Sequence, residues 1–420
     1  MILDGFRREL SPQNVGVLAS AALPQRYGAA RSTLNSPTRP QPILQCFGEV
    51  CCLDRFGGGQ VRNVAGDSEE LYWLHPRSGG LSMAQVVLVA ACSHSPYLFD
   101  TPDTWTASRE RRKLRDDVPW DSAEMNEAKF KRCMNAFATL REKLSAARPD
   151  VLLVFGDDQY EQFRFTNFPA FAVCLGDAFE GTAPPIFSGG LMRKGWPEDS
   201  TEHRIRARGN PELGKYLTMG LMRHGFDPAF CVDLPNKDQG LGHAFTHPSY
   251  YIDPDYRVPI LPFFINCYYP PQPTGQRCNE LGRAVRQLIE EAPLDLRVAV
   301  LGSGGLWHTP LWPDAYLDEA FDQAVLAAVR AGDARRMAEV LDQARWEHPL
   351  TAPPNLPPIL VDMVLGVTGM SGGLASGSGE VRNWIAAAAV ADGTSGTVVD
   401  YVPVYASPCG MGFAYWDQGF

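Results

Sequence analysis

From residue 83 onward, the pattern of hydrophobic and polar positions alternates between two kinds of segment. Short apolar runs, such as VLLVF at 151–155, are typical of buried strands. Between these runs, apolar residues recur every three or four positions, as at 124–146, and this spacing predicts amphipathic helices. The predicted strands span residues 86–91, 151–155, 170–175, 229–234, 258–266 and 297–301, and the predicted helices span 124–146, 211–224, 278–291, 317–330, 334–343 and 380–391.

Strands separated by helices predict the α/β fold class, here as a single large domain with a central mixed sheet flanked by helices. The last third of the chain is predicted to be mostly helical, and no internal repeat divides the chain further. Active sites in α/β sheets gather at strand ends, so polar residues that follow the predicted strands are the first candidates for function.

Residues 1–82 have a different pattern. They contain turn-formers such as SPTRPQP and FGGGQ, show little periodicity and contain no lysine, whereas Met83 stands directly before an apolar strand. This contrast predicts a poorly ordered, flexible N-terminal extension over 1–82 and a catalytic domain over 83–420. A small N-terminal subdomain is the alternative.

Composition narrows the class of protein. Hydrophobic residues make up 45% of the 420 residues and charged residues 20%, as in globular proteins. The formal net charge of -10 argues against a nucleic-acid or anionic-membrane surface. The ten cysteines form no CxxC pair, and the apolar runs are too short to span a bilayer. We therefore expect a cytoplasmic protein with reduced thiols that acts on a small molecule.

Two strand ends carry candidate chemistry in the first half of the domain. His94 follows the strand 86–91 in CSHSP, and the strand 151–155 runs into GDDQYE, which offers Asp157, Asp158, Gln159 and Glu161. Two adjacent aspartates are also common where a turn is closed or a helix is capped. That structural role accounts for one of the two aspartates more easily than for both.

Further polar clusters lie in the loop NKDQGLGHAFTHP and in the segment AVLGSGGLWHTP. The first contains Gln239, His243 and His247, but its glycines and proline make a metal-binding helix unlikely there. In the second, a glycine turn precedes His308, and the lysine of a phosphate-binding loop is absent. A histidine on a rigid turn suits a general base. Glu380 begins a predicted helix, where a glutamate also stabilises the helix dipole without any further function.

The order of these segments resembles the class III extradiol ring-cleavage dioxygenases, the LigB family, and most of all its 3-O-methylgallate dioxygenase branch. The segments that carry the resemblance are CSHSPYLFDTPDTW, RPDVLLVFGDDQYEQF, DQGLGHAF, VPILPFFINCYYPPQPTGQRCNELGRAV, RVAVLGSGGLWH, SGSGEVRNWIAAAA and VDYVPVYASPCGMGFAYW. They extend from residue 83 to the C-terminal region in the order of the family. The resemblance implies a LigB-like fold, catabolism of aromatic compounds, and a homodimer.

The resemblance also implies a non-haem Fe(II) site held by two histidines and a carboxylate, with a catecholic aromatic diol and O2 as substrates. His94 corresponds to the first histidine ligand, Glu380 to the carboxylate, and His308 to the base that accepts a phenolic proton. Gln159 stands where many relatives have the second histidine. It is the expected third ligand, with Asp157, Asp158 and Glu161 as alternatives.

A second departure is DQG in place of the usual DHG, which puts Gln239 where relatives carry a pocket histidine. His243 is nearby and is expected to act beside it as a catalytic hydrogen-bond donor. The oxygen-rich donors also leave two alternatives open: a metal-dependent hydrolase, decarboxylase or isomerase on the same fold, and a non-catalytic partner subunit. Candidates for pairing with a substrate carboxylate are Arg208, Arg283 and Arg382.

Overall fold

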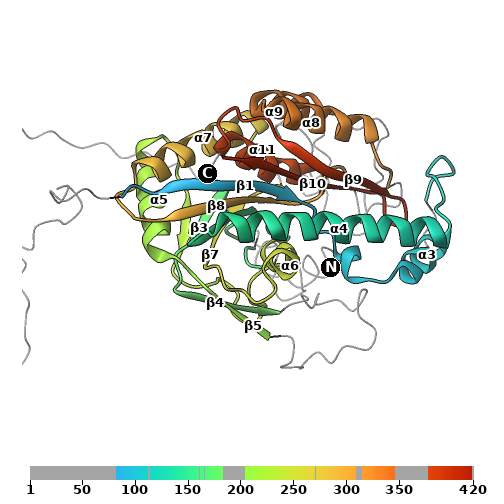
Figure 1. Cartoon of the computed structure of the whole chain (residues 1–420), viewed down its shortest axis with the longest axis horizontal. Helices are drawn as coiled ribbons and strands as arrows, with labels where there is room; N and C mark the ends of the chain where they lie inside the picture. The colour runs from blue at the N-terminus through green and yellow to red at the C-terminus, as the bar shows by residue number, and fades with distance from the viewer. Residues whose placement is uncertain are drawn as a thin grey trace, which may run out of the picture. The chain divides into compact units, whose positions relative to one another are not determined.

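A mixed β-sheet with helices on both faces forms the centre of the protein (Figure 1). The computed structural model describes residues 82–111, 114–159, 161–164, 166–182, 204–269, 271–308, 315–345 and 377–418. The predicted extension over 1–82 therefore lies, apart from residue 82, outside the described residues. The strands are β1 (Gln85–Cys92), β2 (Val151–Gly156), β3 (Phe171–Cys174), β4 (Ala178–Thr182), β5 (Arg204–Arg208), β6 (Ala229–Cys231), β7 (Ile260–Ile265), β8 (Arg297–Ser303), β9 (Thr397–Val404) and β10 (Cys409–Asp417).

Helices connect most of these strands. The α-helices are α3 (Pro102–Arg111), α4 (Ala123–Ala147), α5 (Pro211–Arg223), α6 (His243–Ile252), α7 (Gly275–Glu291), α8 (Glu319–Ala331), α9 (Ala334–Gln343) and α11 (Val381–Val390), and two short 3-10 helices are η1 (Pro96–Phe99) and η3 (Gly377–Glu380). Within the described residues, no helix is both long and apolar enough to cross a membrane.

The strand order of the large sheet is β6-β3-β7-β2-β8-β1-β10-β9. The four central strands β7, β2, β8 and β1 run parallel, whereas β10 pairs antiparallel with β1 and β3 pairs antiparallel with β7. A separate ribbon pairs β4 with β5. The expected mixed sheet flanked by helices is confirmed, and its parallel centre brings the carboxyl ends of β1, β2 and β8 to one edge.

The core lies on both sides of the sheet. On β2, Leu153 and Phe155 pack into the apolar layer toward α7 and α11, and Leu152 and Val154 pack into the layer toward α4 and α6. Figure 1 shows α7, α8, α9 and α11 on one side of the strands, and α4 and α6 on the other. Burial on both faces explains why β2 is apolar without interruption rather than alternating.

Two predictions about secondary structure were wrong. The C-terminal region adds strands β9 and β10 to the sheet, although the last third was expected to be mostly helical. Residues 243–252 form helix α6, although glycines and Pro248 argued against a helix there. Gly242 is the residue before the helix, so it does not interrupt it, and Pro248 lies within α6 at the expense of one backbone hydrogen bond.

Candidate metal centre

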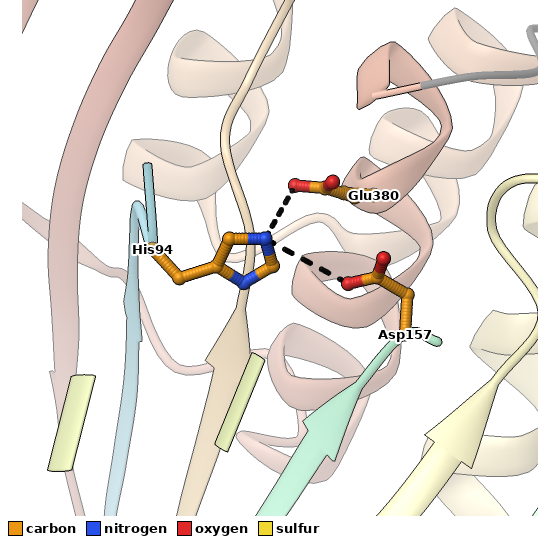
Figure 2. Close-up of side chains that lie close together, drawn as sticks. All are labelled: His94, Asp157 and Glu380. Atoms are coloured by element: carbon orange, nitrogen blue, oxygen red, sulfur yellow. Dashed lines mark ion pairs between the residues drawn. The ribbon is translucent and has the colours of Figure 1, made fainter. Parts of the chain in front are cut away.

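One histidine and two acidic side chains meet at the edge of the sheet where the parallel strands have their carboxyl ends. His94 follows β1, Asp157 follows β2, and Glu380 ends η3, directly before α11. Figure 2 shows the three side chains pointing toward one another from these separate elements. The sheet brings the first two together because neighbouring parallel strands end at the same edge.

The three side chains are almost completely inaccessible to solvent, with exposed fractions of 2% for His94, 1% for Asp157 and 0% for Glu380. His94 Nε2 lies 3.2 Å from Glu380 Oε2 and 3.8 Å from Asp157 Oδ1. One candidate ligand atom from each residue lies within 4.8 Å of the others. Among the described residues, neither His94 Nε2 nor either Asp157 oxygen has a hydrogen-bond partner. These buried atoms of His94 and Asp157, together with the adjacent Glu380 carboxylate, match what a divalent cation binds.

The two carboxylates of the cluster differ in their electrostatics. Burial, reinforced by the neighbouring charge of Glu380, raises the pKa of Asp157 to about 7. Burial also opposes ionisation of Glu380, but His308 and His94 beside it lower its pKa overall. The cluster therefore holds one strongly ionised carboxylate and a second one that ionises near neutral pH.

Two donors hold the carboxylate of Glu380 in place. The backbone N–H of Gly305 donates to Oε2 at 2.8 Å, and the Gln159 side-chain amide donates to Oε1 at 3.1 Å. Gln159, the expected third ligand, thus lies beside the cluster and donates to a candidate ligand. Asp157, one of the alternatives, supplies the carboxylate that faces His94.

The other two acidic alternatives near β2 make different contacts. Asp158 accepts backbone hydrogen bonds from Gln162 at 2.8 Å and from Phe163 at 3.1 Å, so it closes the turn. Glu161 accepts from the backbone N–H of His243 at 3.2 Å and lies 2.7 Å from its Nδ1. The four polar residues of GDDQYE therefore divide into one at the cluster, one beside it and two that hold surrounding backbone.

His243, at the first position of α6, forms a buried ion pair with Glu161. Burial disfavours the imidazolium, but the adjacent Glu161 carboxylate raises the pKa of His243 to about 9. The pKa of Glu161 is lowered because His243 outweighs the effect of burial. The His243 ring centroid lies 4.7 Å from that of His94, so a cationic side chain borders the cluster.

His308 contacts the other oxygen of Glu380. Its Nε2 lies 3.3 Å from Glu380 Oε1, and its Nδ1 lies 3.0 Å from the carbonyl oxygen of Leu306. Because a carbonyl only accepts, Nδ1 carries the proton in this contact. Burial opposes a charge on His308, but Glu380 raises the pKa of the imidazole overall. Its side chain is 12% exposed, against 0% for Glu380, so it stands on the more accessible side of the pair.

Gln239 is the one predicted catalytic residue without a link to the cluster. It is half-buried in the turn before α6, and no hydrogen bond within the described part of the chain connects its side chain with His94, Asp157 or Glu380.

The three arginines proposed for a substrate carboxylate have other surroundings. Arg382 donates to the carbonyl of Pro273 at 2.6 Å, Arg208 donates to that of Arg257 at 2.6 Å, and Arg283 is exposed on α7.

Sequence reasoning did not assign roles to three residues that contact this site. Ser303 Oγ lies 3.0 Å from His94 Nδ1, and His247 Nδ1 donates to the backbone carbonyl of His94. Asp322 accepts from the backbone N–H of Trp307, the neighbour of His308, at 2.7 Å. The four-residue spacing of His243 and His247 was the available signal, and it was discounted because α6 was not expected.

Comparison with known proteins identifies the family of the chain. A family model described as the catalytic LigB subunit of aromatic ring-opening dioxygenase matches residues 118–408. A 2,3-dihydroxyphenylpropionate/2,3-dihydroxicinnamic acid 1,2-dioxygenase from Photorhabdus laumondii is 31% identical over 188 residues, which cover 44% of this chain and 52% of the relative. A gallate dioxygenase from Pseudomonas putida is 32% identical over 123 residues, covering 26% and 35%.

The chain spans about half the length of the first of these relatives. Among solved structures, an uncharacterized protein JW3007 from Escherichia coli K12 aligns with a TM-score of 0.40 and 14% identity, over 78% of this chain and 99% of that one. The family model covers well over half of the 420 residues, including the turn after β2, both histidines of α6 and the segments that carry His308 and Glu380. The chain therefore belongs to the family of the catalytic LigB subunit of aromatic ring-opening dioxygenases.

Proposed function

We propose that the protein is an extradiol dioxygenase that opens the ring of a catecholic aromatic acid with O2, using Fe(II) held by His94, Asp157 and Glu380. The observation that carries the proposal is the buried cluster of these three side chains, with His308 on the second oxygen of Glu380, in a chain of the LigB family. The relatives named above act on dihydroxyphenylpropionate, dihydroxycinnamate and gallate. The likeness to a gallate dioxygenase, together with the sequence resemblance, supports a gallate-like substrate such as 3-O-methylgallate.

The donor set fits a divalent cation. The cluster offers one imidazole nitrogen, a donor type that suits iron, and two carboxylates, a donor type that suits Mn2+. Gln159, by donating to Glu380, holds that carboxylate and is not counted among the ligands in this proposal. When bound, Fe(II) supplies a binding position for both oxygens of a vicinal diol and the electrons that activate O2.

His308 is the proposed general base. Its Nδ1–H is committed to the Leu306 carbonyl, which leaves Nε2 as the atom that takes a proton. Nε2 lies 3.3 Å from Glu380 Oε1, so a diol held at the cluster by the metal would bring its hydroxyl groups close to this nitrogen. Proton transfer to Nε2 converts the phenol to a phenolate, and the carboxylate of Glu380 stabilises the imidazolium that results.

His243 is the proposed second polar group of the pocket. The Glu161 carboxylate keeps its imidazole protonated at neutral pH, and its ring lies against that of His94. A buried cation at this place stabilises negative charge that develops on oxygens bound next to His94. Gln239, a sequence-based catalytic candidate, forms no hydrogen bond with the cluster within the described residues, so this proposal assigns it no role.

A second candidate function follows from Asp157. Two carboxylates and one histidine form a harder donor set than two histidines and one carboxylate, and harder sets suit Mn2+ or Mg2+. The same fold with such a metal serves a non-oxidative reaction, for example a decarboxylation or a hydrolysis, in which the metal polarises a carbonyl group.

One experiment separates these functions. Metal-free protein is loaded anaerobically with Fe(II) or Mn2+, and O2 uptake is measured with gallate, 3-O-methylgallate and 2,3-dihydroxyphenylpropionate. We expect Fe(II)-dependent uptake with at least one of them and a loss of about 10²- to 10⁴-fold in kcat for His308→Ala, with metal binding retained. His224→Asn, a matched histidine at the end of α5, is the control and keeps full activity.

Two other outcomes contradict the proposal. A stoichiometric metal without O2 uptake on any diol favours the non-oxidative enzyme, especially when Mn2+ or Mg2+ binds more tightly than Fe(II). Failure to retain either metal in the wild-type protein favours a non-catalytic partner subunit.

A further inference from the structure

Helix α6 contains a proline that leaves one backbone carbonyl without its helical partner. In an α-helix, the carbonyl of residue i accepts from the N–H of residue i+4. Pro248 has no N–H, and the residue four positions before it is Ala244. Ala244 is fully buried, so water does not replace the missing donor. A buried carbonyl in this position requires another hydrogen-bond donor.

Ser303, the last residue of β8, supplies that donor. Its hydroxyl group donates to the Ala244 carbonyl, and its exposed fraction is 0%. The backbone of Ser303 is held in turn, since Asn383 Nδ2 donates to its carbonyl at 2.7 Å. Pro248 in α6 thus leaves a carbonyl open, and the serine at the end of β8, far away in the sequence, donates to that carbonyl.

This contact determines the direction of the next hydrogen bond. A serine hydroxyl has one hydrogen, and that hydrogen is used toward Ala244. Ser303 Oγ therefore accepts from His94 Nδ1, which lies 3.0 Å away. His94 then carries a proton on Nδ1, and Nε2 is the ring nitrogen that faces Asp157 and Glu380.

We infer that Ser303, directed by the carbonyl that Pro248 leaves open, is a positioning residue that fixes the tautomer and ring orientation of His94. The inference rests on the proposed function only in taking Nε2 as the atom that binds the metal. A histidine ligand is commonly oriented through its other ring nitrogen by an acceptor of this kind. Here the acceptor is itself set by the missing N–H of a proline.

The direct test is the tautomer of His94 in metal-free protein, read from the ¹⁵N shifts of both ring nitrogens at pH 8. We expect the Nδ1–H form in the wild type and a mixture of both tautomers in Ser303→Ala. Ser303→Thr keeps the hydroxyl group and restores the Nδ1–H form. The matched control is Ser249→Ala, since Ser249 is buried and donates to the Phe245 carbonyl within α6 at 2.8 Å. A purely structural serine leaves the tautomer of His94 unchanged when removed, and that result overturns the inference.

A second variant leaves Ser303 in place. Pro248→Ala provides an N–H that competes for the Ala244 carbonyl, so the serine hydroxyl is partly released and a partial shift of the His94 tautomer is expected. An unchanged tautomer in Pro248→Ala removes the proline from the inference, whatever Ser303→Ala shows.

Metal binding gives a readout that does not depend on turnover. Anaerobic titration with Mn2+ or Fe(II) is expected to show about 10- to 100-fold weaker binding in Ser303→Ala, with recovery in Ser303→Thr. If the tautomer and the affinity change as expected but no diol supports O2 uptake, the proposed dioxygenase activity fails while the role of Ser303 stands. If neither variant changes the tautomer, the role of Ser303 fails and the proposed activity is untouched.

Discussion

The turn after β2 and the turn after β8 both deliver polar groups to the same cluster, but they are built by opposite means. Residues 157–163 hold their shape through side chains that bond to backbone. Residues 303–308 approach the cluster through glycines, whose missing side chains leave room for Glu380 and His308. The two turns therefore show two ways of assembling a site at a sheet edge. The first supplies the proposed ligand Asp157, and the second has glycines that leave room for Glu380 and for its own His308.

The turn after β2 depends on a division of work between two adjacent aspartates. Both are buried and both have a pKa raised to about 7, chiefly by that burial. Asp158 accepts two backbone N–H groups, whereas the oxygens of Asp157 accept none among the described residues. The two aspartates are equally buried but have different roles. Of the two, Asp157 is the one whose oxygens accept no hydrogen bond among the described residues and can therefore bind a cation.

The turn after β8 depends on two glycines in succession. A Cβ at Gly304, which has a φ of 155°, would lie 2.7 Å from Glu380 Cβ. A Cβ at Gly305 would lie 2.7 Å from His308 Nδ1. The missing side chain of Gly304 therefore leaves room for Glu380, the candidate ligand, and that of Gly305 leaves room for His308, the candidate base.

The largest effect is expected from Asp157→Asn. The substitution removes one of three proposed ligands and leaves the fold intact, so metal affinity falls by more than about 100-fold, beyond the loss typical of residues behind a ligand. Anaerobic titration with Mn2+ or Fe(II) measures the change. Thermal unfolding without metal should show no loss of stability at pH 8, because the carboxylate that is removed is buried and has a raised pKa.

The pH dependence of the same titration provides an internal check. A cation binds the ionised form of Asp157, whose pKa of about 7 means that protons compete increasingly below that pH. Wild-type affinity should therefore fall by up to about tenfold for each pH unit below 7 and gain little from Asp157 above it. Asp157→Asn should lack this component, and an identical pH profile in both proteins argues against Asp157 as a ligand.

Substitutions of the two glycines should separate metal binding from catalysis. Gly304→Ala displaces Glu380, so we expect about tenfold or greater loss of metal affinity and about 1–3 kcal/mol lower stability from overpacking. Gly305→Ala displaces the His308 ring, so kcat should fall while metal affinity changes less than threefold. Parallel metal titration and O2-uptake measurements check both variants. Equal loss of metal affinity in the two proteins contradicts the separate roles of the two glycines.

The fold followed from the sequence where one physical signal dominated. The uninterrupted apolar run of β2 and the spacing of α4 predicted those elements to within one residue at each end. The strand β9 was not predicted, because its period of two is too short to mark a strand: Val402 and Val404 pack into the layer toward α4 and α6, but Val398 packs on the other side of the sheet, beyond a register shift. Helix α6 was rejected because local propensity disfavours Pro248, and the structure overrides that propensity through a tertiary hydrogen bond from Ser303.

The sequence predicted which residues belong to the site better than it predicted the contacts among them. His94, Glu380 and His308 were singled out from strand ends and family motifs, and the structure brings all three together. The sequence left Asp157, Asp158, Gln159 and Glu161 open because a turn of unknown geometry can present any of them. What separates them is the direction of backbone N–H groups, which no linear pattern specifies.

The smallest effect is expected from Asp158→Asn, and it tests whether the turn after β2 is held as described. Asparagine has one carbonyl oxygen and one amide nitrogen, so it accepts from Gln162 or Phe163 but not from both. One buried N–H is left without a partner, at a cost of about 1–2 kcal/mol in unfolding free energy, measured by urea denaturation. Metal affinity should change by less than about threefold.

The pH dependence of that cost has a definite sign. The folded-state pKa of Asp158 is raised from 3.8 to about 7, by burial first and then by Glu161, so the wild type holds this proton more tightly when folded. Its contribution to stability is fully present below pH 3.8 and is lost as the pH rises through 7. Asparagine does not titrate, so the deficit of Asp158→Asn should be larger at pH 5 than at pH 8. A deficit that grows with pH would mean that the ionised carboxylate of Asp158 stabilises the folded state, which contradicts the raised pKa of this group.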